Sequence, residues 1–332
     1  MRAVVLVGGV GSRLRPLTFT TPKPMLPVGH LPMIERLVGR LARGGVSEVV
    51  LALGFKPEPF IEAFPDGRCG DVTLTYAVEP EPLDTAGAVG FAAAHAGIDD
   101  TFVVANGDVM TDLDVGALVA AHRTASAEAT IHLVAVDDPS SFGVVDIGDD
   151  HRIRRFVEKP ERGTEPSNLI NAGTYVFEPS VLDRIPGGRR VSVERDTFPA
   201  VCADEALFGF PTDDYWIDAG VPDLYRSANL DLIGDLRRSE SAEAVGEGAH
   251  VDPEATVINT VVGAGATVGA GTTVVDSVIL PGGVIGDRAQ VESSLVMGHV
   301  GEDATVIEAI VGADGVVVDG DVLAHDTLPP VD

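Results

Sequence analysis

The sequence predicts an α/β fold in which a mostly parallel, Rossmann-like sheet is followed by a left-handed parallel β-helix. Through about residue 136, short apolar runs alternate with helical segments, a pattern typical of a parallel sheet covered on both faces. After a polar stretch at residues 237–243, aliphatic residues recur about every sixth position. This hexapeptide periodicity is a signature of a parallel β-helix.

The elements of the first part follow from apolar runs bounded by glycine, proline or charged residues. The predicted strands are residues 3–7, 48–53, 72–78, 101–105 and 130–136, and the predicted helices are residues 33–43, 57–64, 85–95 and 115–124. In sheets of this kind, ligands bind beyond the carboxyl ends of the strands. Residues 8–23 and 106–108 lie at such ends and are therefore the predicted site.

Residues 142–218 predict a more antiparallel stretch. Residues 142–160 are expected to form a hairpin that turns at 148–150, and residues 171–177 to form another strand. A helix is predicted for residues 222–236. The polar residues that follow it predict a domain boundary, with one domain at residues 1–238 and a β-helix domain at residues 245–325.

The repeats of the second domain read VGEGAH, VDPEAT, VGAGAT, VGAGTT, IGDRAQ, VGEDAT and VGADGV. Each repeat cannot bury its own apolar face, so stability comes from stacking on its neighbours. Breaks in the period at residues 276–281 and 293–299 are expected to form irregular corners. The aliphatic residues expected to point inward are Val245, Val251, Val262, Val268, Val274, Ile285, Val300, Val306 and Val311. A flexible glycine-rich tail is the alternative, which such regular spacing argues against.

Composition excludes several classes of partner. The net charge of −28 argues against nucleic acid or an anionic membrane, because either requires a basic face. Cys69 and Cys202 form neither a disulfide framework nor a metal-ligand spacing. The apolar start is too short for a signal peptide, and no apolar run reaches membrane-spanning length. A cytoplasmic protein is expected.

The segment at residues 4–23, VVLVGGVGSRLRPLTFTTPK, has the physical outline of a nucleoside triphosphate site. Its apolar run is followed by a glycine cluster and then by Arg13, Arg15 and Lys23. Glycine lets backbone N–H groups approach an anion closely, and the cations can neutralise it. The alternative is a glycine-rich turn with solvated arginines, because the spacing matches neither the dinucleotide fingerprint nor the phosphate loop.

Two aspartates stand out among many acidic residues because each follows an apolar stretch directly. They are Asp108, in ANGDV, and Asp218, in YWIDAG. Carboxylates are natural Mg²⁺ ligands, and few are needed because the metal keeps waters and substrate oxygens. Taken alone, each aspartate is also typical of a strand-end turn.

The compound pattern GGxGSRLxPLT followed by PKP resembles the sugar-nucleotide pyrophosphorylases, which join a nucleoside triphosphate to a sugar 1-phosphate. The resemblance covers nearly the whole chain, the β-helix included. It implies catalytic roles for Arg13, Lys23 and Asp108, and Mg²⁺ held by Asp108 and Asp218. Sugar-phosphate binding is implied for Glu158, Lys159, Asn171 and Gly173. Nucleotide binding is implied for Leu6, Gly8, Gly9, Gly11, Ser12, Glu79, Thr85, Gly87 and Gly107.

The resemblance places Glu79 where the family reads the base. Guanine presents two adjacent donors, which one carboxylate can accept together, so GTP is favoured over other triphosphates; Glu79 as an ordinary solvated residue remains the alternative. One position departs from the family, which usually has glycine where this chain has Asp84. That aspartate puts base and ribose contacts in doubt, or it caps a helix starting near Thr85, with Gly87 still available for close approach.

Two rival functions stay open at this point. One is a thymidylyl- or uridylyltransferase acting on glucose 1-phosphate. The other is an inactive regulatory subunit that binds nucleotide sugars, as the family is known to include. Retention of all the charged motif residues favours an active enzyme. A homo-oligomer is also expected, since exposed coil ends of a β-helix often associate.

Overall fold

A computed structural model of the protein describes residues 1–54, 57–234 and 236–331. The chain divides into two compact units, each described here by itself. Unit 1 contains Met1–Gly9 and Ile34–Trp216, and unit 2 contains Val10–Met33 and Ile217–Asp332. The domain boundary near residue 238 stays a prediction.

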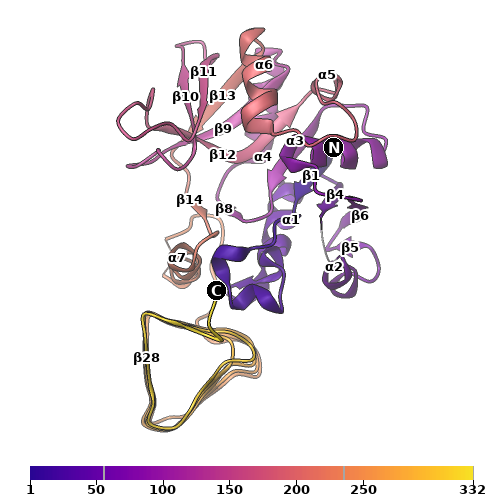
Figure 1. The fold of residues 1–332 in the computed structure, drawn as a ribbon. Helices are drawn as coiled ribbons and strands as arrows, with labels where there is room; N and C mark the ends of the chain where they lie inside the picture. The colour runs from indigo at the N-terminus through magenta and orange to yellow at the C-terminus, as the bar shows by residue number, and fades with distance from the viewer. Residues whose placement is uncertain (55–56, 235, 332) are drawn as a thin grey trace. The chain divides into compact units, whose positions relative to one another are not determined.

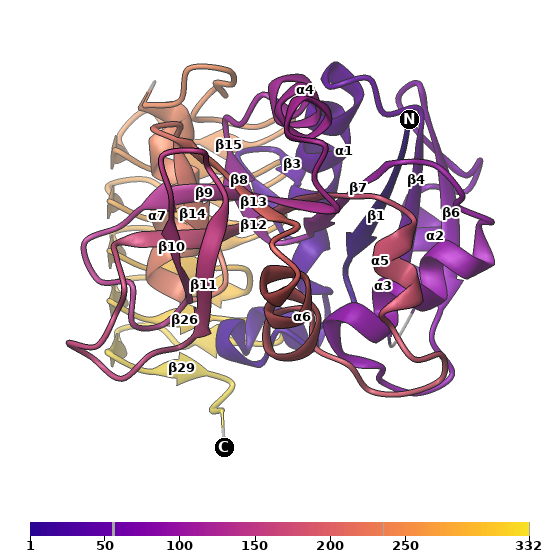
Figure 2. The same cartoon turned by 90° about the horizontal axis from the view of Figure 1, so that it is seen from above.

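The centre of unit 1 is a parallel sheet with the strand order β7-β1-β4-β6, which can be followed in Figure 2. These strands are β7 (Phe102–Asn106), β1 (Arg2–Leu6), β4 (Glu48–Leu53) and β6 (Val72–Val78). Successive β1 residues Val4 and Val5 point to opposite faces, and both are fully buried. The sheet is therefore covered on both faces, as predicted.

The other side of this sheet is antiparallel in part. β12 (Leu169–Phe177) runs antiparallel to β7 and to β9 (Ala129–Ala135), and β9 pairs in parallel with β13 (Leu207–Thr212). β10 (Gly143–Ile147) and β11 (Ile153–Glu158) form the predicted hairpin, and β5 (Arg68–Cys69) ends the other edge. The sheet is consequently mixed. The predicted ligand-binding site lies at the carboxyl ends of its parallel strands.

The helices of unit 1 match the predicted segments within one residue at each end. They are α1 (Met33–Arg43), α2 (Glu58–Ala63), α3 (Asp84–His95) and α4 (Val115–Ala125). Further short elements were not predicted, because they are too brief to show periodicity. These are β8 (Val109–Thr111), α5 (Ser180–Asp183), the π-helical turn η4 (Val193–Thr197), α6 (Phe198–Ala203) and β14 (Trp216–Asp218).

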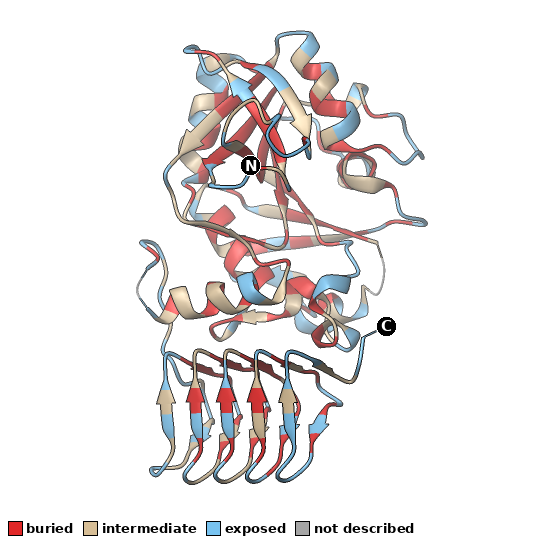
Figure 3. Ribbon diagram, turned by 60° about the vertical axis from the view of Figure 1, so that its left-hand side comes forward, coloured by how far each residue is buried: buried red, intermediate tan, exposed pale blue. Residues whose placement is uncertain are grey.

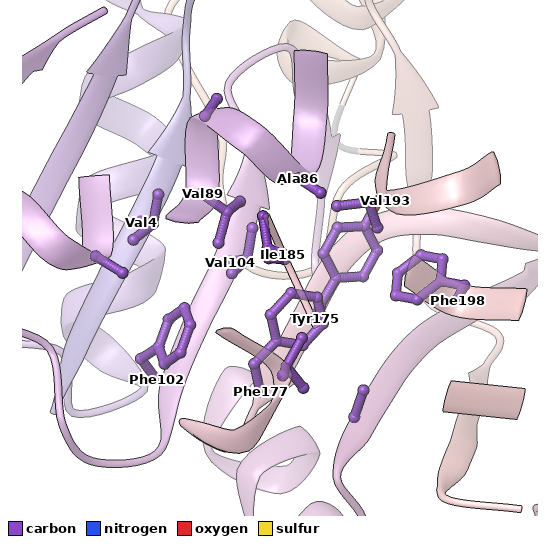
Figure 4. Close-up of a cluster of buried hydrophobic side chains, with 14 of the residues drawn as sticks. Val4, Ala86, Val89, Phe102, Val104, Tyr175, Phe177, Ile185, Val193 and Phe198 are labelled. Atoms are coloured by element: carbon purple, nitrogen blue, oxygen red, sulfur yellow. The ribbon is translucent and has the colours of Figure 1, made fainter. Parts of the chain in front are cut away.

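The main hydrophobic core packs α3 against the sheet through small side chains such as Ala86 and Val89, as Figure 4 shows. Beside them, three aromatic rings stack and cross: Tyr175 lies parallel to Phe177, with ring centroids 5.8 Å apart, and edge-on to Phe198 at 5.1 Å. These rings fix β12 and η4–α6 together, which places residues 191–198 next to the start of α3.

Unit 2 begins with a series of one-turn helices. These are η1 (Ser12–Leu14), η2 (Leu17–Phe19) and η3 (Lys23–Met25), followed by the strands β2 (Pro27–Val28) and β3 (Leu31–Pro32). The helices η1 and η2 lie in residues 11–20, GSRLRPLTFT, which we call the arginine motif. α7 (Pro222–Ile233) follows Asp218. It was predicted to extend to residue 236, and residue 235 lies outside the described residues.

The rest of unit 2 is a parallel β-helix whose coils have a triangular outline in Figure 1. Its three faces are parallel ladders, and strands of the first face start 17 residues apart, at His250, Thr267 and Val284. The first face contains β15 (His250–Val251), β18 (Thr267–Val268), β21 (Val284–Ile285), β24 (His299–Val300) and β27 (Val316–Val317). The second contains β16 (Thr256–Ile258), β19 (Thr273–Val275), β22 (Gln290–Glu292), β25 (Thr305–Ile307) and β28 (Val322–Ala324). The third contains β17 (Val261–Val262), β20 (Val278–Ile279), β23 (Leu295–Val296), β26 (Ile310–Val311) and β29 (Thr327–Leu328).

The predicted β-helix is confirmed, with two corrections. Val245 is 46% exposed instead of pointing inward, because it precedes the first full coil and pairs only through an isolated bridge to Val262. The breaks in the hexapeptide period are not corners alone, although Asp276 and Ser293 do turn the chain there with φ 47° and 51°. They contain β20 and β23 of the third face, whose residues Ile279 and Val296 are fully buried in the coil core. Figure 3 shows buried residues along the middle coils and more exposed ones at the ends. No helix among the described residues is long and apolar enough to span a membrane.

Candidate active site

The glycine loop leaves unit 1 at the carboxyl end of β1, where two backbones approach closely. A Cβ atom added to Gly8 would lie 3.0 Å from the backbone nitrogen of Gly54, and one added to Gly54 would lie 3.0 Å from the Gly8 carbonyl oxygen. Gly8 is therefore explained by packing against the end of β4. Gly9 is exposed, and nothing lies within 4 Å of its Cβ position. Of Gly8 and Gly9, therefore, Gly9 is the one whose backbone a ligand can approach.

Glu79 follows β6 at the same edge of the sheet, held by a hydrogen bond from its backbone N–H to the Leu53 carbonyl at 2.8 Å. The residue is only 8% exposed, and its Oε2 accepts a hydrogen bond from the Leu83 N–H at 2.9 Å. Burial raises the pKa of the Glu79 carboxyl above its usual range, opposed by the Leu83 hydrogen bond. The other oxygen, Oε1, lies 3.7 Å from the Cβ position of Gly8. The carboxylate is thus held at one oxygen and faces the glycine loop with the other.

Asp84 does not cap a helix that follows it, because α3 begins at Asp84 itself and Leu83 precedes the helix. Its φ is 62°, a left-handed conformation that glycine adopts most easily and that Asp tolerates better than most residues. This explains why glycine suits the position. The carboxylate is used locally: Oδ1 accepts from the Thr85 N–H at 2.8 Å, and Oδ2 pairs with Arg195 Nη2 at 2.8 Å.

The start of α3 is linked to residues 191–195 by further hydrogen bonds. The Thr85 hydroxyl donates to Glu194 Oε2 at 2.9 Å and accepts from the Val193 N–H at 2.8 Å. The N–H groups of Ala86 and Gly87 both donate to the Val191 carbonyl. A Cβ atom on Gly87 would lie 2.7 Å from the Arg189 carbonyl oxygen. Protein atoms therefore occupy the space beside Gly87 that was expected to remain available for close approach, and the nucleotide contacts of Thr85 and Gly87 stay predictions.

The NAG motif forms an irregularity in β12. The register with β9 shifts between Asn171 and Tyr175, and Gly173 has φ 76°, as in a β-bulge that re-aims neighbouring side chains. Asn171 accepts from the Gly173 N–H through Oδ1 and donates to the Tyr175 hydroxyl through Nδ2, both at 3.0 Å. A Cβ on Gly173 would lie 2.8 Å from Asn106 Nδ2. Gly173 is thus required by both conformation and close packing.

The EKP motif lies at the end of β11. Lys159 has φ 47° and its side chain is 68% exposed, with Nζ 3.7 Å from Glu158 Oε1. Burial raises the pKa of the Glu158 carboxyl, and the Glu194 carboxylate raises it further, while Lys159 and Arg195 lower it. A non-glycine residue in a left-handed conformation often marks a functional site. The ammonium group stands in solvent beside a half-buried carboxylate, an arrangement suited to a polar ligand with an anionic end.

Asp108 follows β7, and the preceding N–H of Gly107 donates to the Leu6 carbonyl at 2.9 Å. This bond places Gly107 and Asp108 at the same sheet edge as Gly8 and Glu79. Burial raises the pKa of the Tyr175 hydroxyl strongly, with smaller effects in the same direction from Glu194, Glu158 and Asp108.

In unit 2, the arginine motif is a tight series of turns. Gly11 has φ 61° and precedes η1, and a Cβ there would lie 3.0 Å from Thr18 Cγ2 and 3.1 Å from Lys23 Cβ. The Thr18 hydroxyl also donates to the Gly11 carbonyl at 2.8 Å. Ser12 and Arg13 are exposed in η1, whereas Lys23 is buried. Gly11 thus lets the arginine turn close on the lysine.

Three charged side chains of unit 2 converge on Gly220, and we call them the charged cluster: Arg13, Lys23 and Asp218. A Cβ atom added to Gly220 would lie 2.7 Å from Asp218 Oδ1, 2.8 Å from Lys23 Nζ and 2.9 Å from Arg13 Nη2. Lys23 Nζ and Asp218 Oδ1 are 3.9 Å apart. Because Gly220 has no side chain, the ends of Arg13, Lys23 and Asp218 can occupy the space beside it.

The residues expected to hold Mg²⁺ fit that ion in chemistry. Asp108 and Asp218 both supply carboxylate oxygens, which Mg²⁺ prefers, and one or two carboxylates suffice when substrate phosphates and waters complete the octahedron. Across residues 1–54, 57–234 and 236–331, no group of three or more His, Cys, Asp or Glu side chains is arranged to hold a metal.

The predicted residues fall into two sets. Unit 1 brings together Glu79, Thr85, Gly107, Asp108 and the sugar-side motifs, and unit 2 brings together Gly11, Ser12 and the charged cluster. Sequence reasoning missed four residues that shape these sets: Gly54, Glu194, Arg195 and Gly220. Gly220 was visible as the glycine of YWIDAG. No sequence signal marks the other three, because their partners are distant in the chain.

Comparison with known proteins identifies the family of the chain. Residues 2–234 match the family model described as nucleotidyl transferase. A mannose-1-phosphate guanylyltransferase of Mycobacterium tuberculosis is 41% identical over 268 residues, covering 78% of this chain and 74% of that protein. A mannose-1-phosphate guanyltransferase of Schizosaccharomyces pombe is 40% identical over 268 residues, covering 77% and 73%.

Two solved structures are similar in fold and sequence. A Bacillus anthracis protein named as a glucose-1-phosphate thymidylyltransferase, in complex with a sucrose, gives a TM-score of 0.65 at 28% identity, covering 73% of this chain and 97% of that one. HddC from Yersinia pseudotuberculosis complexed with GMP-PN gives 0.58 at 29% identity, covering 69% and 97%. The match of the family model to most of the chain, together with relatives near 40% identity, shows that the chain belongs to the nucleotidyl transferase family.

Proposed function

We propose that the protein is a mannose-1-phosphate guanylyltransferase, which makes GDP-mannose and pyrophosphate from GTP and mannose 1-phosphate. The observation that carries the proposal is the identity of about 40% to proteins of that name from a bacterium and a yeast. The charged cluster supplies the matching chemistry, because Arg13, Lys23 and Asp218 meet beside Gly220 and two cations can neutralise a triphosphate.

The reaction is an in-line attack of the sugar phosphate on the α-phosphorus of GTP. A bond forms between an oxygen of mannose 1-phosphate and that phosphorus, the bond to the β-phosphate breaks, and pyrophosphate leaves. The two anions repel each other, so catalysis depends on positioning and charge neutralisation. Arg13 and Lys23 neutralise the triphosphate and the charge that develops on pyrophosphate.

Asp108 and Asp218 would hold Mg²⁺, which would supply charge neutralisation at the phosphates. Lys159 would contact the phosphate of mannose 1-phosphate, and Glu158 would accept hydrogen bonds from sugar hydroxyls. Asn171 and Gly173 would contact the sugar as well. An exposed ammonium group on a left-handed residue fits a compact phosphate contact, since lysine acts as a point charge.

Glu79 would read the base. Its Oε2 is already fixed by Leu83 N–H, and its Oε1 faces the glycine loop, so the carboxylate is oriented to accept from adjacent guanine donors. The nucleotide lies along Leu6, Gly8 and Gly9, and the protein is expected to act in the cytoplasm. The resemblance to the structure of HddC complexed with GMP-PN is consistent with a guanine nucleotide.

A thymidylyltransferase acting on glucose 1-phosphate is the second candidate, favoured by the Bacillus anthracis structure. Its identity of 28% is well below the 41% of the guanylyltransferase relative, so it ranks second. An inactive regulatory subunit ranks below both, because Arg13, Lys23 and Asp218 meet at one point in unit 2.

One assay separates these functions. Pyrophosphate release is measured with GTP, UTP, dTTP and ATP, each against mannose 1-phosphate and glucose 1-phosphate, with Mg²⁺ and with excess chelator. We expect turnover with GTP and mannose 1-phosphate that chelation abolishes. Preference for dTTP and glucose 1-phosphate would select the second candidate, and no release from any pair would select the regulatory subunit.

A further inference from the structure

The third face of the β-helix differs from the other two faces in its burial. In β17, β20 and β23, the residues preceding the inward-pointing ones are Val261, Val278 and Leu295. These residues point outward, yet they are only 1–2% exposed. Outward residues of the second face, such as Thr273 and Gln290, are exposed. Other parts of the chain therefore cover these three residues.

Part of the cover is α7, which contacts β17 and β20. Arg226 of α7 donates through Nη1 to the Asp276 carbonyl at 3.2 Å, at the corner before β20. α7 begins two residues after Gly220 and four after Asp218. The third face thus supports the helix that directly follows the carboxylate of the charged cluster.

The arginine motif also contacts this side of the β-helix. Met297 and Gly312 are equivalent positions, directly after β23 and β26 on the third face. Met297 contacts Thr20, with Sδ 4.0 Å from Oγ1. A Cβ on Gly312 would meet only Pro16 among its three nearest atoms, at 2.9 Å from Cβ, 3.0 Å from Cγ and 3.3 Å from the carbonyl oxygen. In one coil, the Met297 side chain reaches Thr20. In the next coil, the lack of a side chain at Gly312 leaves room for Pro16.

Pro16 is three residues from Arg13, and backbone hydrogen bonds constrain the chain on both sides of Pro16. Arg15 donates through its N–H to the Ser12 carbonyl at 3.3 Å, and the Phe19 N–H donates to the Pro16 carbonyl at 3.1 Å. Moving Pro16 must therefore move the turn that carries Arg13. Farther along the chain, after β2, the Gly29 N–H donates to Asn229 Oδ1 of α7 at 2.8 Å.

We propose that the third face of the β-helix is the platform that sets the geometry of the charged cluster, and that Gly312 is a positioning residue acting through Pro16. The inference rests on the proposed function, since the cluster is what handles the triphosphate. It gives the β-helix a part in turnover of each subunit, separate from any part in assembly.

The test is a graded series, Gly312→Ala and Gly312→Val, compared with Gly301→Ala. Gly301 is a matched control, because a Cβ there would meet only β-helix atoms, the nearest being Asp319 Oδ1 at 2.4 Å. Restoring a 3.4 Å contact requires Pro16 to move about half an ångström, so Gly312→Ala should lower kcat/KM for GTP about tenfold, and valine should lower it more. The KM for mannose 1-phosphate should stay within about twofold, because Glu158 and Lys159 belong to unit 1.

Gly301→Ala should lower the melting temperature while keeping kcat. Wild-type kinetics in a folded Gly312→Ala variant, or an equal kinetic loss in Gly301→Ala, would overturn the inference. If the Gly312 variants do not fold, Met297→Ala replaces them: it removes the contact to Thr20 without overfilling, and an unchanged KM for GTP would overturn the inference as well. Absence of turnover in the wild type would instead reject the proposed function.

Discussion

Gly220→Ala is the substitution that most directly probes the charged cluster. The added methyl carbon would lie 2.7, 2.8 and 2.9 Å from Asp218 Oδ1, Lys23 Nζ and Arg13 Nη2, whereas ordinary contact begins at 3.4 Å. The three polar atoms must therefore withdraw by about 0.5–0.7 Å in different directions. A misplacement of about 1 Å can cost ~10²-fold in rate, so kcat/KM for GTP should fall about 10- to 100-fold, or about 1.4–2.7 kcal/mol.

The fold should survive this change. Gly220 is not among the residues with a left-handed φ, and the clashing atoms are ends of side chains. We expect a melting temperature within a few degrees of wild type. The control is Gly187→Ala, where nothing lies within 4 Å of the Cβ position and φ is likewise not left-handed. Pyrophosphate release by Gly220→Ala within twofold of wild type, with the control unchanged, would show that the triphosphate does not use this convergence of charges.

Three further predictions concern the base, the sugar phosphate and a buried histidine. In Glu79→Gln, Leu83 N–H should hold the amide oxygen and turn the NH₂ group toward the guanine donors, lowering the GTP-to-dTTP preference about ten- to a hundredfold; an equal loss for both triphosphates in competition assays would assign Glu79 a structural role only. Lys159→Arg should raise the KM for mannose 1-phosphate more than that for GTP, because the planar head does not fit a point-charge site, and equal effects on both constants would contradict this. Burial, aided by Arg40, lowers the pKa of His132 to about 3. The native state therefore stays unprotonated at this histidine, while the unfolded state binds a proton below about pH 6.5. The free energy of unfolding consequently falls as the pH falls below about 6.5, by about 2 kcal/mol at pH 5. Denaturant unfolding at pH 7.5 and pH 5 should therefore show a smaller pH dependence in His132→Gln than in wild type, and an unchanged dependence would reject the reasoning.

The fold was largely predictable because its signals are local. The parallel strands and helices of unit 1 follow from apolar periodicity, and β4 (Glu48–Leu53), β6 (Val72–Val78) and α1 (Met33–Arg43) have the predicted bounds. The third face of the β-helix was misread for a physical reason. Its strands β17 and β20 start five residues after β16 and β19 of the second face, whereas β16 and β19 start six residues after β15 and β18 of the first face. The third face therefore falls out of the hexapeptide period.

The candidate site was predictable where a motif carries its own chemistry and unpredictable where it depends on distant partners. Arg13, Lys23 and Asp218 were identified from their motifs and do meet in unit 2. The ion pair between Asp84 and Arg195 spans 111 residues, and neither residue lies in a recognisable pattern with the other. Asp84 looked like a helix cap because aspartate before a helix usually is one; its left-handed φ is a property of the loop's path, which composition does not reveal.

The glycines of this chain show why a motif alone underdetermines a site. Gly8 is required by the backbone of Gly54, Gly11 by its left-handed φ and Gly87 by the Arg189 carbonyl, so each has a packing or conformational reason that needs no ligand. Gly9 has neither reason: its φ is not left-handed and its Cβ position is open. Since glycine lowers the stability of an ordered chain relative to alanine, a glycine with no structural need is the one whose presence a bound nucleotide would explain.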